Sequence, residues 1–497
     1  MKRRSPGISL SPLLAILLGM AAVGPASAET DTLRLTLDQA VERVLGLGEE
    51  MKLADADLAS AKAQYLQARA TALPQIFGSG TYTRQIESIF RMEGDGPGFD
   101  PFEPDTLAPL EDRVRDLEQA LPGSGLAGLA SLFSSTAFGS ENSWVASVGV
   151  TQRLIQGGSI WGSIAAAGHA MRAAREMKQD RADELTLAGR AAYLGALLAD
   201  RGVRIAELSL DQSESHLERV RLRQQVGEAS EFELLQAEVA TGNQIPIVKM
   251  AKAARETAYL ELRRLANLPR LAPLRLESPL LDDAAVPTDP AAVDTTGLEQ
   301  DALRTSGVKA LDEVLQARED AVLVAKSDLW PDLSLFANYS RQAYPDDLLP
   351  KSDEWAKDIN VGARAVWNVF DGFRTKGYIQ QAKAQRSVAR QNLNQVRELI
   401  QQSVVQGRLE LERSSSDLHA RGQTVRLARK AYELAELRYE EGASSLLELN
   451  DTRIAYQIAQ TNEAQARHDY FLALARLERL SGRPLFTSTV QAVGLSR

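Results

Sequence analysis

The sequence predicts an α+β membrane protein built from two copies of one plan, with four β-strands and two long helical hairpins in all. Three observations support this fold class. Short sequence matches return in the same order in the two halves, four segments alternate apolar and polar residues, and two proline-free connections have the length of very long helices. The 497 residues leave room for two or three ordinary domains or for one elongated molecule.

The composition excludes several classes of function. The net charge is −9, whereas a nucleic-acid partner requires a basic surface, so none is expected. The absence of cysteine rules out disulfides and thiolate chemistry. No phosphate-binding loop or catalytic motif is present, and the histidines lack the spacing of metal ligands, so we expect no metal, no cofactor and no enzyme activity. The histidines are His169, His216, His419 and His468.

The first 28 residues have the order of a secretory signal peptide. Basic residues at 2–4 precede an apolar run at 13–18, and the small residues Ala26 and Ala28 suit a cleavage site. The apolar run is too short to span a bilayer, which takes roughly 20 residues. We therefore expect cleavage after Ala28 and export of the mature chain.

An internal duplication organises the rest of the chain. LPQIFGSGTY (73–82) corresponds to WPDLSLFANY (330–339), and RLRQQVGEASEFELL (221–235) corresponds to RYEEGASSLLEL (438–449). Each half therefore has the order helix, strand, connection, strand, very long helix, tight turn, helix. The predicted divisions are a first repeat at 29–269, a Pro-rich linker at 270–294, a second repeat at 295–484 and a tail at 485–497.

Four segments alternate with the period of a strand, at about 74–84, 144–155, 331–341 and 358–370. A soluble sandwich would show the same alternation. Two features favour a membrane wall: the lengths are near the 9–11 residues of a tilted membrane strand, and aromatic residues lie near strand ends. We expect Trp144, Tyr339 and Trp367 to face lipid or its interface. Since four strands cannot close a membrane barrel and lipid forbids unpaired edges, several protomers must pool their strands.

Each second strand leads into a long helical hairpin, at about 158–268 and 372–481. The first helix of each hairpin is about 70 residues without proline and would extend roughly 100 Å. In the second hairpin a coiled-coil spacing is carried by Val425, Ala428, Tyr432, Ala435 and Tyr439. The strand at 358–370 is expected to lead into its helix without a loop, so that strand and helix form one continuous wall that passes from the lipid into the water. The connection at 85–143 is expected to be a loop with a short helix at 110–121.

Each hairpin turn combines a glycine suited to positive φ with a serine and a glutamate that suit a capping box. These residues are Gly227, Ser230 and Glu233 in the first turn and Gly442, Ser445 and Glu448 in the second. Ordinary helix-hairpin chemistry explains all six.

Two stretches resemble one known family. VFDGFRTKGYIQQAKAQ (369–385) is similar to the strand-to-helix junction of TolC-like outer-membrane efflux proteins, and RYEEGASSLLELNDTR (438–453) is similar to their hairpin tip. With the duplication and the leader, the resemblance covers nearly all of the mature chain. The first junction departs from it, because LIQGGSIWG (154–162) stands where an LF-D-G-G sequence is expected.

The resemblance implies a homotrimer in the outer membrane of a Gram-negative bacterium. Three protomers would contribute four strands each to a twelve-stranded barrel that continues as a long periplasmic α-helical barrel. Such a protein is the passive exit duct of a tripartite efflux pump or type I secretion system. It would be embedded in outer-membrane lipid and joined to an inner-membrane transporter through a periplasmic adaptor that grips the hairpin tips. The resemblance does not identify the exported cargo.

The resemblance also gives roles to particular charges. Glu448 and Asp451, at i and i+3, match positions where the family can carry an acidic ring at the periplasmic constriction, and Glu233 would add less charge from the first repeat. The alternative is that they are ordinary solvated helix acids. Arg153 and Arg364, on the polar strand faces, would point into the lumen and either tune ion selectivity or pair with a nearby acid, which we favour.

Two other functions compete with the duct. A periplasmic adaptor also has long helical hairpins, but it needs β-rich segments of a lipoyl-like kind around one hairpin, whereas here the hairpin occurs twice. A secreted coiled-coil structural protein leaves the four alternating segments unexplained.

Overall fold

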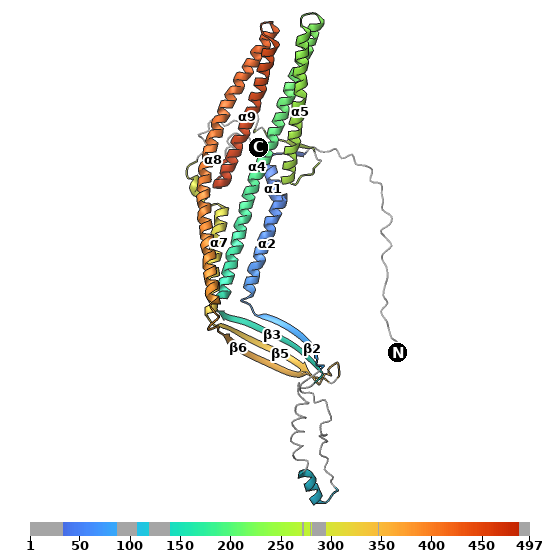
Figure 1. The fold of residues 1–497 in the computed structure, drawn as a ribbon, viewed down its shortest axis with the longest axis vertical. Coiled ribbons are helices and arrows are strands. Elements are labelled where there is room, and N and C mark those ends of the chain that lie inside the picture. Colours follow the sequence, from blue (N-terminus) through green and yellow to red (C-terminus); the bar gives the residue numbers. More distant parts are fainter. Residues whose placement is uncertain are drawn as a thin grey trace, which may run out of the picture.

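The computed structural model describes residues 33–86, 107–118, 140–270, 273–278, 280, 295–345 and 347–486. The molecule is elongated: two long helical hairpins extend one way from a middle region, and a curved four-stranded sheet extends the other way (Figure 1). The predicted signal peptide, most of the linker at 270–294 and most of the tail at 485–497 lie outside the described residues. Within the connection at 85–143, residues 110–118 are helical.

Two hairpins of long helices account for most of the chain. The first joins α4 (Ser159–Gln225) to α5 (Glu231–Leu265), and the second joins α8 (Arg374–Glu440) to α9 (Leu446–Ser481). α4 and α8 contain 67 residues each, or about 100 Å of helix. On α8 the five residues of the predicted coiled-coil spacing are buried or half-buried, whereas Leu427, Leu434 and Leu437 beside them are exposed.

Shorter elements pack beside the sheet-proximal parts of α4 and α8. Two helices in series, α1 and α2, contact α4, and α7 lies between α4 and α8 (Figure 1). A parallel pair of three-residue strands, β1 and β4, joins the start of the first repeat to the segment after α5. The bounds are β1 Leu33–Leu35, α1 Leu37–Leu47, α2 Glu49–Ala70, β4 Leu274–Leu276, α6 Leu298–Ala302, α7 Ser306–Lys326 and the 3₁₀ turn η2 Ser327–Leu329.

None of the described helices combines the length and the apolar character that a bilayer-crossing helix requires.

The main apolar core lies in the middle region, where α1, α4, α5, α8 and α9 meet. Tyr193, Leu262 and Leu474 are fully buried there. Each of the two leucines contributes about 1.5–3 kcal/mol by leaving water. The core also includes Leu485 and Phe486, and the Arg190 guanidinium lies 4.6 Å from the Phe486 ring centre. The first two residues of the predicted tail therefore belong to the packed fold, because they cover the end of α9.

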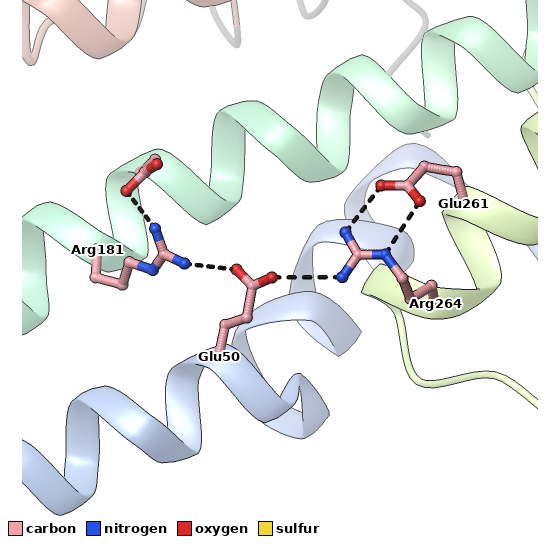
Figure 2. A network of polar contacts seen from close by, with 5 residues as sticks. Glu50, Arg181, Glu261 and Arg264 are labelled. Atoms are coloured by element: carbon pink, nitrogen blue, oxygen red, sulfur yellow. Dashed lines mark hydrogen bonds and ion pairs between the residues drawn. The ribbon is translucent and has the colours of Figure 1, made fainter.

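An ion network fastens the helices of the first repeat around this core (Figure 2). The Glu50 carboxylate of α2 accepts from Arg181 of α4 at 2.8 Å and from Arg264 of α5 at 3.4 Å. Arg264 also donates to Glu261 at 2.8 Å. The bond to Glu261 holds the pKa of that carboxyl below its usual range. One carboxylate thus connects three helices that are far apart in sequence.

The sheet has the order β2-β3-β5-β6, and every pair in it is antiparallel. The two halves of the chain meet at the β3–β5 pair, where Val148 lies opposite Tyr339. Among the described strands, β2 and β6 each have a neighbour on one side only, so the sheet ends in two edges. The strands are β2 Gln75–Arg84, β3 Asn142–Gln156, β5 Asp332–Ala343 and β6 Ala356–Val366.

The register places apolar and polar residues on opposite faces. On the apolar face, Val148, Tyr339 and Ile359 form one row across three strands. A bulge between Arg153 and Ile155 shifts the alternation of β3, so that Ile155 lies opposite Leu333. Leu154, which simple alternation places on the apolar face, is instead the extra residue of this bulge. Serine, threonine and asparagine are the commonest residues of the polar face, which also carries Phe77 and Phe336.

The second strand-to-helix junction differs from the prediction. β6 ends at Val366 rather than at 370, and α8 begins at Arg374, so seven residues separate them. Phe373 has a positive φ of 67°, and the Asp371 carboxylate accepts from the Thr375 backbone N–H at 2.8 Å. Only the first junction is short, with Gly157 and Gly158 between β3 and α4. The alternation of Trp367 and Val369 continues beyond the last paired residue, which is why it misled the prediction.

Candidate functional site

Both hairpin tips turn through a glycine. Gly227 and Gly442 have φ values of 81° and 69°, which L-residues adopt only at a cost. The Glu228 N–H donates to the Arg223 carbonyl at 2.8 Å, and the Ala443 N–H donates to the Arg438 carbonyl at 2.7 Å. This six-to-one bond is the Schellman arrangement, which satisfies carbonyls that a helix end would otherwise leave unpaired. The two repeats therefore share one tip backbone.

The two tips differ in their caps. In the first, the Ser230 hydroxyl accepts from the Glu233 N–H at 3.2 Å and the Glu233 carboxylate accepts from the Ser230 N–H at 2.9 Å, which completes the predicted capping box. In the second, Ser445 caps Glu448 in the same way, but the Glu448 carboxylate does not return to Ser445. The second capping box is therefore only half formed, contrary to the prediction.

Two neighbours explain this difference. Arg438 donates to the Glu448 carboxylate at 3.1 Å, and the Ser444 hydroxyl donates to it at 2.8 Å. In the first tip, alanine at 229 stands in place of Ser444 and offers no hydroxyl, so Glu233 turns back to the backbone.

The predicted acidic pair does share one side of α9. Glu448 is held in the tip by Arg438, whereas Asp451 is exposed and has no hydrogen-bond or ion-pair partner among the described residues. Glu233 is occupied by its capping box. In one protomer, Asp451 is therefore the acid best placed to act on something outside the chain.

A buried polar cluster that the sequence analysis missed lies between the two hairpins near their tips. His216 of α4 is 8% exposed and Arg453 of α9 is 5% exposed. They line a cavity of about 10 Å³, room for roughly one water molecule. Neither ring nitrogen of His216 has a hydrogen-bond partner within the described part of the chain. A single histidine within the mostly polar run 213–218 gives no sequence signal of such burial.

The surroundings of His216 oppose its protonation. Burial is the main cause, and the nearby guanidinium groups of Arg219, Arg453 and Arg223 add to it, so the pKa of His216 is lowered to about 4. The Tyr439 ring lies 5.2 Å away from the imidazole. The imidazole is therefore neutral at ordinary pH and packs as an uncharged group between the hairpins.

The register brings the two predicted sheet arginines together. Arg153 of β3 and Arg364 of β6 are both register partners of Ser334 on the intervening strand β5, on the polar face. Arg364 lies 5.7 Å from the Phe336 ring centre. Neither arginine forms an ion pair with a described residue, so the favoured expectation of a partner acid is wrong for one protomer. Their row neighbours are a serine and each other, not a carboxylate.

The predicted aromatic residues occupy two levels of the sheet. Trp144 stacks near Tyr82 with ring centres 4.7 Å apart, and its indole N–H donates to the Leu348 carbonyl at 2.9 Å. Tyr339 lies on the same face. Trp367 is at the opposite end, just after β6, and its indole donates to the Leu329 carbonyl at 3.3 Å. Aromatic side chains at both ends of an apolar face are the arrangement of a membrane-spanning sheet.

A sequence model of the outer membrane efflux protein family matches residues 40–268 and 304–483. The two matched segments cover most of the chain and correspond to its two halves. The chain therefore belongs to the outer membrane efflux protein family. It is an outer-membrane protein whose helical part extends into the periplasm, and the adaptor and coiled-coil alternatives are not supported.

Curated relatives are more distant. The chain is 28% identical over 334 residues to the pyoverdine export outer membrane protein OpmQ of Pseudomonas aeruginosa strain PAO1, covering 65% of this chain and 66% of that protein. It is 25% identical over 333 residues to the OpmQ of Pseudomonas putida strain KT2440, covering 65% and 67%. The match thus spans just under two thirds of the length of the first relative.

Solved structures share the fold over nearly the whole chain. The outer membrane channel CmeC of Campylobacter jejuni superposes with a TM-score of 0.72 at 15% identity, covering 92% of this chain and 89% of CmeC. CusC, studied for transmembrane channel formation, gives 0.70 at 15% identity, covering 90% and 92%. The open state of the Neisseria gonorrhoeae MtrE channel gives 0.66 at 17% identity, covering 90% and 89%.

Proposed function

We propose that three copies of this chain form the passive exit duct of an efflux or secretion system. Their sheets close a twelve-stranded barrel, and their hairpins continue it as a hollow helical barrel. The open sheet carries the proposal: it has one apolar and one polar face, and its edges β2 and β6 lack outer neighbours among the described strands. Since every backbone group in lipid needs a partner, other copies must complete the ladder.

The polar face then lines the lumen and the apolar face meets lipid. Arg153 and Arg364 would give the lumen a positive row at one level, repeated in each protomer, and would favour anionic solutes there. We assign the chain no catalytic step. Its similarity to pyoverdine export outer membrane proteins supports a cargo similar to pyoverdine.

The hairpin tips would receive the periplasmic adaptor, which links the duct to an inner-membrane transporter. The Schellman turns at Gly227 and Gly442 and the caps at Ser230 and Ser445 fix the tip backbone and leave other side chains, such as Phe232, exposed. A rigid tip lowers the entropy cost of docking a partner.

We further propose that Asp451, with Glu448, forms an acidic ring at the periplasmic constriction. Three copies of the unpaired Asp451 carboxylate would concentrate cations there. Glu448 contributes less, because Arg438 offsets its charge.

Single-channel recording tests both the duct and the ring. We expect the parent protein to conduct in planar bilayers and to be blocked by divalent cations, and Asp451→Ala to weaken that block more than Glu448→Ala does. Glu412→Ala, at an exposed position in the middle of α8, is the matched control and should change nothing. A parent protein that never conducts would contradict the duct. Unchanged block in the Asp451→Ala and Glu448→Ala double variant would contradict the ring alone.

A further inference from the structure

Two basic side chains lie side by side on the apolar face of the sheet. Arg341 of β5 and Lys357 of β6 are direct register partners near the β5–β6 connection, and both are exposed. Like charges placed opposite each other on one face destabilise a strand pair. A cation on a lipid-facing surface also carries a desolvation cost, which is small near the interface and grows toward the bilayer centre. A ligand that offsets both charges would remove this cost.

The described part of the chain supplies no such group. Arg341 and Lys357 form no ion pair there, and Arg341 donates only to the Tyr339 hydroxyl, at 3.0 Å. Arg84 at the same end of the apolar face does have an acid, because its guanidinium lies 3.7 Å from the Glu141 carboxylate. Arg341 and Lys357 therefore lack an acidic partner, whereas Arg84 at the same end of the sheet has one.

An apolar groove begins beside these charges. It has a volume of about 450 Å³ and lies across β2, β3 and β5. Its lining combines small residues with larger side chains and includes Arg341. The lining side chains on this face are Gly78, Ala146, Val148, Tyr339, Arg341 and Trp355. A hydrocarbon chain fits such a groove, and an anionic group attached to it would reach the guanidinium.

The position of the groove along the sheet fixes which leaflet it meets. It lies in the half of the sheet away from the helices, at the level of Tyr339; Trp355 lines it and Trp144 lies two residues along β3 from Ala146. Aromatic residues of this kind mark the membrane interface. Because the helical part extends into the periplasm, this end is the extracellular one and the adjacent lipid belongs to the outer leaflet.

We propose that the Arg341–Lys357 pair and the adjoining groove bind a phosphorylated lipid of the outer leaflet, with a phosphate on the two cations and an acyl chain in the groove. The outer-leaflet lipid with this chemistry is lipopolysaccharide, through its phosphorylated and acylated lipid A. This inference rests on the proposed function, which places the apolar face in the membrane.

Binding of purified lipopolysaccharide to the detergent-solubilised full-length protein tests the proposal. Each basic residue near a membrane surface is worth a factor of several in affinity for anionic lipid, so Arg341→Gln with Lys357→Gln should bind about 30-fold more weakly. Arg341→Lys with Lys357→Arg should retain affinity. The matched control, Arg426→Gln with Lys430→Gln, removes two exposed cations from α8, away from the sheet, and should bind like the parent.

Retained affinity in the Arg341→Gln and Lys357→Gln variant, or equal loss in the α8 control, would overturn the proposal. Competition by inorganic phosphate as strong as by lipopolysaccharide would also overturn it, since the acyl chain would then contribute nothing. Migration of each variant on native gels shows whether it has folded. Conductance of the parent in phosphatidylcholine bilayers is recorded in parallel, so that failure of the duct is seen separately from failure of lipid binding.

Discussion

At the scale of single residues, the tips show how far local sequence determines structure. A glycine with a serine three residues later predicted the positive φ and the serine cap in both repeats, because each requirement is met within one turn of helix. The hydrogen-bond partners of the Glu448 carboxylate could not be predicted, since Ser445, Ser444 and Arg438 compete for it. The same limit hid the unpaired state of Arg153 and Arg364, which only the strand register reveals.

The tip glycines give a direct prediction at this scale. Gly227→Ala or Gly442→Ala should destabilise its hairpin tip by about 1–2 kcal/mol, the cost of a left-handed L-residue. Nothing lies within 4 Å of a Cβ added at either position, so conformational strain is the only cause. Hydrogen exchange of the tip amides measures the change.

Gly202 of α4 provides the control. It also has open space around an added Cβ, but its backbone is helical, so Gly202→Ala should leave the hairpin unchanged or stabilise it by up to about 1 kcal/mol. If all three substitutions had the same effect, positive φ would not be the reason for the tip glycines.

At the scale of elements, periodicity predicted helices better than strand ends. The 67-residue helices follow from long proline-free segments with a continuous stripe, which no turn interrupts. The end of β6 at Val366 did not follow, because Trp367 and Val369 keep the alternation after the ladder has stopped. A strand ends where its partner ends, and that partner is distant in sequence. The contact of the hairpins at His216 is hidden for the same reason.

The pairing of the two hairpins should depend on pH through His216. Its folded pKa of about 4 lies below the ordinary 6.5, so the unfolded chain binds the proton more readily in that window. Stability is therefore complete above pH 6.5 and is lost as the pH falls toward 4. The loss should reach about 2 kcal/mol at pH 5. Arg219, Arg223 and Arg453 face the ring, and Glu436 is engaged by Arg219 at 3.3 Å.

Thermal unfolding at pH 7 and pH 5 checks this prediction. His216→Gln removes the titrating group and should reduce the difference between the two pH values, whereas His419→Gln, at an exposed position on α8, should not. An equal pH dependence in parent and His216→Gln would show that the buried imidazole does not couple the hairpins to pH.

At the scale of the whole molecule, duplication and strand number were visible in the sequence, and so was the need for further copies. The sequence matches at 73–82 and 330–339 become β2 and β5, which both run beside β3 in one sheet. Alternation also placed Arg153 and Arg364 on the polar face, but it failed beyond Arg153, where the bulge at Leu154 adds one residue without any sequence signal. The lipid groove did not follow, since its lining comes from three strands and a connection.

The central claim is that β6 of one copy pairs with β2 of the next, and disulfide trapping tests it most directly. The chain has no cysteine, so Val361→Cys in β6 can be combined in turn with Ile76→Cys, Gly78→Cys or Gly80→Cys in β2. At least one pair should give a covalent trimer on a denaturing gel after oxidation, whereas a mixture of two single-cysteine chains should give dimers at most. A protein that forms no intermolecular crosslink and stays a stable monomer without detergent would contradict the account.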